Sequence, residues 1–219
     1  MAYEITRDYI RHGDARPGTK GKRRRFIVAH DTGNPGSTAY GNRSYFNNHQ
    51  PSASAHTFID DQYILEIIPL DEVAYHVRYD VSTANDEAIG VELCWGGSID
   101  FKEAYKRYVW YMAYLCEQHN LDPQNDIVAH STLDPGRRTD PQNALNRYGI
   151  SWAEFIEDVK KSFDGGTIEY DPKTKPAQTK PKYTKVTGRW TGQTLEIYQK
   201  GQPVRELQAC LKSKGYLGN

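Results

Sequence analysis

Residues 23–36, RRRFIVAHDTGNPG, contain a short apolar run that ends in a histidine and is followed by turn-forming residues. The four residues IVAH at 27–30 recur unchanged at 127–130, within NDIVAHSTLDPGRRTDP. A short apolar run bounded by charge on one side and by Gly and Pro on the other predicts a buried strand. We therefore expect two buried strands, each ending in a histidine at the sheet edge, where a loop can open a site.

Further patterns predict the elements around these two strands. The segments SAHTFID (54–60), YILEIIPL (63–70) and AIGVELC (88–94) indicate three more strands. Apolar residues three or four apart over 101–119 predict a long helix. A second helix is expected over 151–163, because Ser151 is followed three residues later by Glu154, the pattern of a capping box. Strands that alternate with helices favour an α/β domain with a mixed central sheet flanked by helices.

Composition excludes several classes of protein. The 219 residues carry 28 Lys and Arg against 28 Asp and Glu, so the net charge of zero argues against a nucleic-acid binder held by electrostatics. No apolar run is long enough to span a bilayer, and the charged N-terminus lacks the apolar core of a signal peptide. The three cysteines show no regular spacing and are expected to be reduced thiols.

The composition changes after residue 163. Residues 164–182 are rich in Pro, Lys, Thr and Gly and predict a linker. Residues 183–219 form a short tail, in which Val204, Leu207, Cys210 and Leu211 predict one apolar face of a helix. A tail of this length is too short to bury a core by itself. We expect a domain at 1–163, a linker at 164–182 and a small segment at 183–219.

The repeated strand ending suggests a metal site. Adjacent strands would bring His30 and His130 together, and two imidazoles with one anionic ligand leave an open position on zinc. Asp140 is a candidate third ligand, because the Pro- and Gly-containing loop before it can fold back toward His130. The alternative is that both histidines are merely hydrogen-bonded strand ends.

Four motifs, IVAHDTG, SAHTFID, AIGVEL and AHSTLDPGRRTDP, occur in an order that resembles the type-2 N-acetylmuramoyl-L-alanine amidases, which include phage endolysins, autolysins and peptidoglycan recognition proteins. The resemblance covers approximately residues 26–163 and implies that His30, His130 and Asp140 hold Zn²⁺. Many members carry cysteine where Asp140 stands, but aspartate has the same charge and also binds zinc. Arg138 stands where a lysine often polarises the substrate carbonyl; it keeps the charge on a wider, planar group.

The resemblance and the residues together suggest further roles. Glu92 is an acid within an apolar strand, a costly position unless the carboxylate is used or paired, and it is the candidate general base and acid. The resemblance places His76 near the substrate, with Tyr75 where tryptophan is usual. It also matches Asn85 to a common family asparagine. We count Asn85 among the substrate-binding candidates, although a structural role is also expected. His56 is expected to orient the site or pack under it.

The resemblance implies zinc-dependent hydrolysis of the amide bond between N-acetylmuramic acid and L-alanine, with bacterial peptidoglycan as the partner. The tail resembles the start of a type-1 peptidoglycan-binding domain. With no export signal visible, we expect a monomeric endolysin that is made in the bacterial host cytoplasm and reaches the wall after release. The alternatives are a recognition module without catalysis, which Asp140 and Glu92 argue against, and a zinc peptidase that cuts elsewhere in the stem peptide.

Overall fold

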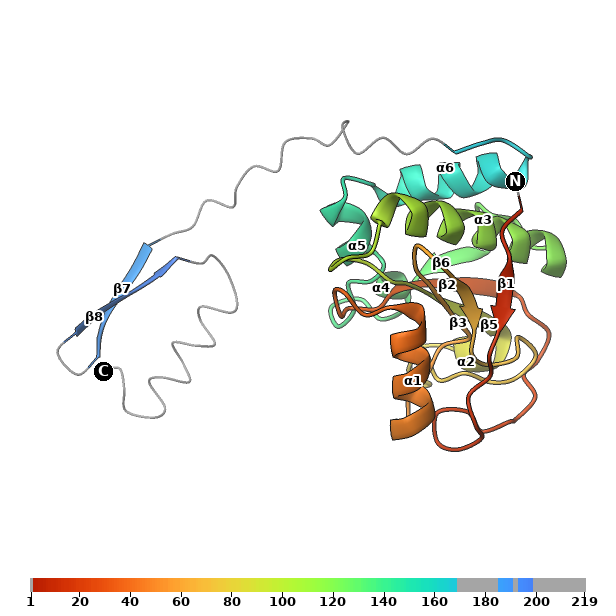
Figure 1. Ribbon diagram of the computed structural model, residues 1–219, viewed down its shortest axis with the longest axis horizontal. Coiled ribbons are helices and arrows are strands. Elements are labelled where there is room, and N and C mark those ends of the chain that lie inside the picture. Colours follow the sequence, from red (N-terminus) through yellow and green to blue (C-terminus); the bar gives the residue numbers. More distant parts are fainter. Residues whose placement is uncertain (1, 169–184, 191–192, 199–219) are drawn as a thin grey trace. The chain divides into compact units, whose positions relative to one another are not determined.

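The computed structural model of the chain describes residues 2–168, 185–190 and 193–198 (Figure 1). The chain divides into two compact units, Met1–Thr174 and Lys175–Asn219. The first unit contains all the residues that the sequence marks as candidates for a site. The described residues of the second unit form an antiparallel strand pair, β7 (Lys185–Trp190) with β8 (Gln193–Tyr198).

A six-stranded mixed sheet forms the centre of the first unit, with the strand order β1-β4-β3-β5-β2-β6. Its strands are β1 (Ile5–Arg7), β2 (Phe26–Asp31), β3 (Thr57–Ile59), β4 (Ile64–Glu66), β5 (Ala88–Leu93) and β6 (Ile127–Ala129). Only the β3–β4 pair is antiparallel; the other neighbouring strands are parallel. The predicted α/β fold with a mixed sheet is confirmed, and the five predicted strands are all present.

The repeated IVAH sequences lie side by side. Strand β2 pairs in parallel with β6, so that Ile27 is opposite Ile127 and Ala29 is opposite Ala129. On its other edge β2 pairs in parallel with β5, and there His30 is opposite Glu92. Because the side chains of register partners point to the same face of a sheet, these three strands deliver their last side chains to one place.

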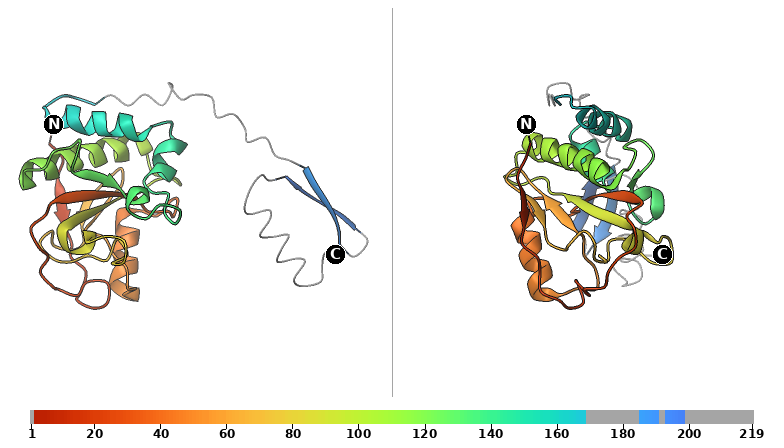
Figure 2. Two further views of the ribbon diagram at one scale, coloured as in Figure 1. Left: turned by 180° about the vertical axis from the view of Figure 1, so that it is seen from behind. Right: turned by 90° about the vertical axis from the view of Figure 1, so that its right-hand side faces the viewer.

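Helices cover the sheet on both faces (Figure 2). They are α1 (Ala39–His49), α2 (Ala84–Glu87), α3 (Phe101–His119), α4 (His130–Leu133), α5 (Gln142–Arg147) and α6 (Trp152–Phe163). The two predicted helices are α3 and α6, which pack together on one face, while α1 lies on the opposite face. None of the helices in the described part of the chain has the length and apolar character that crossing a membrane requires.

The long helix α3 fixes the strand ends that carry the candidate site. Its buried Tyr108 places its hydroxyl 3.1 Å from the carbonyl oxygen of His30 and 3.3 Å from that of Val91. A buried hydroxyl in this position satisfies carbonyl groups that would otherwise lose their hydrogen bonds to water. The apolar stripe of α3 is therefore core, as predicted, and it also anchors β2 and β5 from behind.

Several elements differ from the sequence-based expectations. Helix α1 buries only Ala39 and has little apolar periodicity, so no pattern indicated it. The buried Ile168, which the sequence placed in the linker, packs in the core of the first unit. The strand pair β7–β8 was not predicted. Most of the predicted linker, and the helix expected around 204–211, lie outside the described residues. Of the cysteines, Cys94 and Cys116 are free and buried.

The capping box at the start of α6 offers a test of the fold. The Ser151 hydroxyl accepts a hydrogen bond from the Glu154 amide, and the Glu154 carboxylate accepts one from the Ser151 amide. Ser151→Ala should lower the free energy of unfolding by about 0.5–2 kcal/mol, because the Glu154 amide loses its hydrogen-bond acceptor. Urea denaturation followed by the helical circular dichroism signal measures this. Ser162→Ala, in the last turn of the same helix, is the control and should change the free energy much less.

Candidate functional site

Three side chains that could bind a metal converge at the ends of β2 and β6. His30 is in β2, His130 is the first residue of α4, and Asp140 lies in the loop after α4. One nitrogen of each histidine and one carboxylate oxygen lie within 4.8 Å of one another, and all three residues are buried. Strand β6 ends where the sequence predicted, and α4 begins at once, which turns the chain toward Asp140.

The carboxylate of Asp140 lies between the two imidazoles. Its Oδ2 atom is 2.9 Å from Nδ1 of His30 and 2.9 Å from Nδ1 of His130. Burial disfavours the charged carboxylate, but the hydrogen bonds to His130 and His30 outweigh it and hold the pKa of Asp140 well below its usual range. Burial lowers the pKa of His30, which favours the neutral imidazole that a metal needs.

The loop that carries Asp140 is fastened at both ends. The Ser131 amide donates to the carbonyl oxygen of Asp140, at 3.0 Å. Within the loop, the buried Asp134 carboxylate accepts two hydrogen bonds from the Arg78 guanidinium and a longer one from Arg137. A bidentate arginine–carboxylate pair fixes both position and orientation. The loop therefore holds Asp140 in place without help from a ligand.

The three residues fit a zinc ion. Two imidazole nitrogens and a carboxylate oxygen are a donor set typical of catalytic zinc, which keeps its fourth position open. Zinc bonds of about 2.0–2.2 Å at tetrahedral angles place ligand atoms about 3.3–3.6 Å apart. The 2.9 Å separations from Asp140 to each histidine need only a small expansion to match this spacing. His30, His130 and Asp140 would hold the ion through Nδ1, Nδ1 and a carboxylate oxygen.

Glu92 adds a second carboxylate beside this group. It is the register partner of His30 across the β5–β2 pair. Its Oε2 atom is shielded from solvent and has no hydrogen-bond partner among the described residues. Burial raises the pKa of Glu92 well above its usual range, and the charges of Asp140 and Asp31 raise it further. A carboxyl group with a raised pKa and a free oxygen is suited to accept and release a proton.

His76 contacts the metal-binding group from the side. Its Nδ1 atom lies 3.1 Å from Nε2 of His30, and its own Nε2 is buried without a partner in the described structure. Asn85 holds this residue in place: its side-chain oxygen accepts the backbone amides of His76 and Val77. The amide nitrogen of Asn85 donates to the Val77 carbonyl, so all these contacts are with the backbone.

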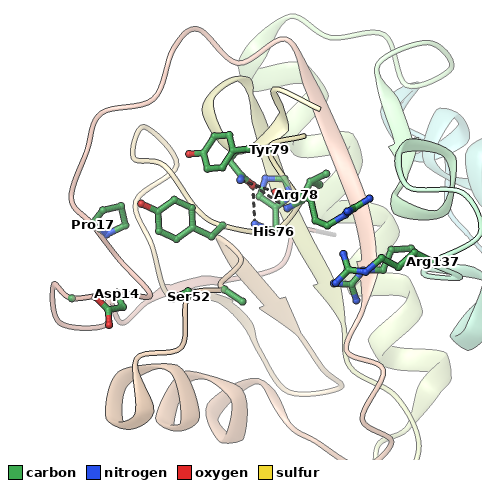
Figure 3. Close-up of a pocket in the computed structure, with 13 residues that line it drawn as sticks. Asp14, Pro17, Ser52, His76, Arg78, Tyr79 and Arg137 are labelled. Carbon is green, nitrogen blue, oxygen red and sulfur yellow. Dashed lines mark hydrogen bonds between the residues drawn. The ribbon is translucent and has the colours of Figure 1, made fainter. Parts of the chain in front are cut away.

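A cleft of about 650 Å³ opens beside His76 (Figure 3). Its walls include Tyr75, Arg78 and Tyr79 on one segment and Arg137 and Arg138 on the Asp140 loop. Figure 3 shows Arg78 and Arg137 at the same end of the cleft, with Tyr79 on the other side of His76. The backbone amide of the exposed Arg138 donates to the Asp134 carbonyl, but its side chain forms no hydrogen bond or ion pair with another described residue, which leaves the guanidinium available to a ligand.

Asp31 is a functional candidate that the sequence reasoning missed. The buried carboxylate accepts hydrogen bonds from the amides of Gly33 and Ala144 and from the indole of Trp95. Asp31 therefore connects the end of β2 to α5, the helix that begins at Gln142, shortly after Asp140. Burial raises the pKa of Asp31, while the hydrogen bonds from the Ala144 and Gly33 amides lower it. The signal in the sequence was an acidic residue directly after an apolar strand. The interpretation assigned the functional role at this strand end to His30 alone.

Fold and site together define a mixed α/β domain with a group of three side chains that could hold a metal, and comparison with known proteins shows the family. The N-acetylmuramoyl-L-alanine amidase family pattern matches residues 20–143, a range that contains all four of His30, Glu92, His130 and Asp140. The chain belongs to this family. The predicted resemblance to it is confirmed.

Similar proteins carry the same description. The chain is 32% identical over 179 residues to the N-acetylmuramoyl-L-alanine amidase BlyA of Bacillus subtilis (strain 168), which covers 74% of this chain and 48% of BlyA. It is 28% identical to the amidase CwlH of the same organism, over 94% of this chain and 76% of CwlH. The chain therefore spans about half the length of BlyA. The solved catalytic domain of XlyA superimposes with a TM-score of 0.63 at 26% identity, over 72% of this chain and 99% of that domain.

The metal-binding group can be tested directly. The chelator-stripped protein should bind one zinc ion, and His30→Ala or Asp140→Asn should weaken binding by more than about 100-fold. Losing one of three ligands should cost more than the 10–100-fold loss typical of an outer hydrogen-bond partner. Competition with a chromophoric chelator measures the affinity. His49→Ala is the control, because this ring stacks on Tyr45 at the surface; equal weakening by the control would contradict the assignment.

Proposed function

We propose that the chain is a zinc-dependent N-acetylmuramoyl-L-alanine amidase, which hydrolyses the amide bond between N-acetylmuramic acid and L-alanine in bacterial peptidoglycan. The observation that carries the proposal is the convergence of His30, His130 and Asp140 beside the unpartnered carboxyl oxygen of Glu92. The family match and the names of the similar proteins support the choice of bond.

The roles of the residues follow from their positions. Zinc, when held by His30, His130 and Asp140, supplies Lewis-acid polarisation of a carbonyl and an activated water. Glu92 takes a proton on its free Oε2 from the attacking water and passes it to the leaving nitrogen. The raised pKa of Glu92 suits both steps, because the carboxyl group both accepts and returns the proton.

Arg138 acts at the open side of the site. Its guanidinium has no partner in the described structure and lies in the cleft wall, so it can donate to the carbonyl oxygen as negative charge develops there. Asn85 acts indirectly in this scheme: it fixes the backbone of His76, and His76 lines the cleft that receives the substrate.

The proposal extends to where the enzyme acts. Peptidoglycan is its macromolecular partner, and neither nucleic acid nor membrane is needed. We propose an endolysin-type monomer, made in the cytoplasm of a bacterial host, that lyses the wall after its release. In this proposal the catalytic parts reside in the first unit, and residues 183–219 serve as a partial wall-binding segment.

Product analysis tests the bond that is cut. Purified peptidoglycan digested with the zinc-loaded protein should yield peptides with a free L-alanine amino terminus and no new reducing sugars, as read by mass spectrometry. New termini elsewhere in the stem peptide would identify a zinc peptidase instead. Binding to the wall without any release by the zinc-loaded protein would identify a recognition module. Asp140→Asn is the inactive comparison.

The role of Glu92 predicts a rate effect without a metal effect. Glu92→Gln keeps the shape of the side chain and removes the proton acceptor, so the turnover number should fall by about 10²–10⁴. Zinc affinity, measured in parallel, should change little. Glu117→Gln, at an exposed position on α3, is the matched control. A near-normal rate for Glu92→Gln would show that another group moves the proton.

Arg138→Ala should also lower the turnover number. Arg138→Lys should have a milder effect, because the positive charge is kept.

A further inference from the structure

Residues near the N-terminus contribute to one wall of the cleft beside His76. The wall is lined by Gly13, Asp14, Pro17 and Ser52. Figure 3 shows Asp14 on one side of His76 and Arg137 on the other. The matched family pattern begins at residue 20, so the first three of these residues lie outside it. The family pattern therefore does not determine what this wall can bind.

Hydrogen bonds fix the loop that carries Asp14. The side-chain oxygen of Gln50, the C-cap residue of α1, accepts the Ala15 amide at 3.0 Å, and Ala15 itself is fully buried. The Arg16 guanidinium donates to both carboxylate oxygens of Glu72, at 2.7 and 2.9 Å. Such a bidentate pair fixes orientation as well as position. The flanking residues thus hold Asp14 at a defined place, while Asp14 itself is exposed to solvent.

The Asp14 carboxylate has no internal partner. It forms no hydrogen bond or ion pair with another residue in the described part of the chain. The neighbouring Arg11 donates instead to the carbonyl oxygen of Asn47. Ion pairs of the same N-terminal segment are closed within the protein, Arg16 with Glu72, Lys20 with Asp71 and Arg43 with Asp8. Asp14 is also the one acidic residue among the described residues that line the cleft, so its charge is available to a ligand.

The opposite side of the cleft carries positive charge. Three guanidinium groups line it, those of Arg78, Arg137 and Arg138. Two carboxylates accept hydrogen bonds from them, the buried Asp134 and the exposed Asp80. The side chain of Arg138 has no partner among the described residues, so one positive charge is left uncompensated. The cleft therefore has a positive side and a negative side, which matches a ligand that carries both charges.

We propose that Asp14 is a specificity-determining residue, which binds a primary amine, carried as an ammonium group, on the peptide part of the substrate. The inference rests on the proposed function, since it concerns the peptide that the cleft would hold. An ammonium group donates three hydrogen bonds, and the Asp14 carboxylate and the Ser52 hydroxyl offer acceptors on the same wall. A metal ion such as Ca²⁺ would need about six to eight oxygen ligands, more than this wall supplies.

Acylation of the amine removes the charge that Asp14 recognises. When a second peptide is joined to this amine through an amide bond, the nitrogen becomes neutral and the ion pair is lost. An ion pair between exposed groups changes affinity by about 1.5–5-fold, and salt screens it. Because Asp14 would hold a part of the substrate remote from the bond that is cut, its contribution appears in KM and not in the turnover number. The cleft should therefore prefer peptides that have not been joined through their amine.

Kinetics with three matched substrates test the proposal on the zinc-loaded full chain. The substrates are muramyl peptides that differ at one lysine side chain, which is free, acetylated or succinylated and so carries a positive charge, no charge or a negative charge. KM should rise in this order, by about 1.5–5-fold at each step at low ionic strength, and the differences should shrink in about 1 M salt. Equal KM values would overturn the inference and leave the proposed function standing. Cleavage of none of the three would overturn the proposed function, and the inference with it.

Two variants separate the effect of charge from the effect of size. Asp14→Asn keeps the shape of the side chain and should remove the preference for the free amine over the acetylated one. Asp14→Lys should reverse the order, so that the succinylated peptide has the lowest KM. Asp164→Asn, at the exposed C-cap of α6, is the matched control and should keep the order of the unaltered protein. A preference for the free amine that persists in Asp14→Asn would show that the bulk of the acyl group decides, and it would overturn the inference.

Discussion

The parallel pairing of β2 with its two neighbours determines where the chemistry can occur. Strand β2 lies between β5 and β6, and the register sets His30 opposite Glu92 while Ala29 is opposite Ala129. Parallel strands end at the same edge, so His130, the next residue after β6, joins them there. A shift of one residue in either pairing would turn a site residue to the opposite face. The register is held by apolar side chains of β2, β5 and β6, which are buried between the helical layers.

The site concentrates polar groups where water is largely excluded, and most of them are paired. Asp140 accepts from two histidines, Asp134 from two arginines, and Asp31 from two amides and an indole. The buried atoms that remain unpaired among the described residues are Thr32 Oγ1, His76 Nε2, Glu92 Oε2 and His130 Nε2. Buried polar atoms without partners are costly and uncommon, so their gathering at one sheet edge is itself a mark of function.

The sequence predicted the elements with strong local signals and missed those that depend on tertiary contacts. The repeated IVAH runs, the stripe of α3 and the Ser151 cap each carry a pattern that local physics dictates. Helix α1 does not, because it fully buries only Ala39 and its apolar residues do not follow a helical spacing. The convergence of His30 and His130 followed from adjacent parallel strands. The loop before Asp140 and the apolar strand around Glu92 marked these two residues as candidates, and the family resemblance supplied their roles, since neither loop closure nor register can be read from spacing alone.

The side-chain contacts around the cleft could not be predicted from the sequence. Asn85 matched a family position, but that its amide holds the backbone of His76 depends on how the segment before α2 folds over β5. Gly90 had no visible role until the His76 ring was seen to occupy the space of its missing side chain. Asp31 was predicted only as part of a turn. In each case the partner is distant in sequence, and no local pattern encodes it.

The aspartate at position 140 also contributes to how the site is assembled. A carboxylate oxygen is a strong acceptor and takes an N–H from both His30 and His130, at 2.9 Å each. A thiolate, which the resemblance places there in many relatives, is a weaker hydrogen-bond acceptor than a carboxylate. The carboxylate thus preorganises the three ligands, but its hydrogen bonds must be broken before the ion can bind. Aspartate at this position therefore sets the relative positions of all three candidate ligands through its two hydrogen bonds.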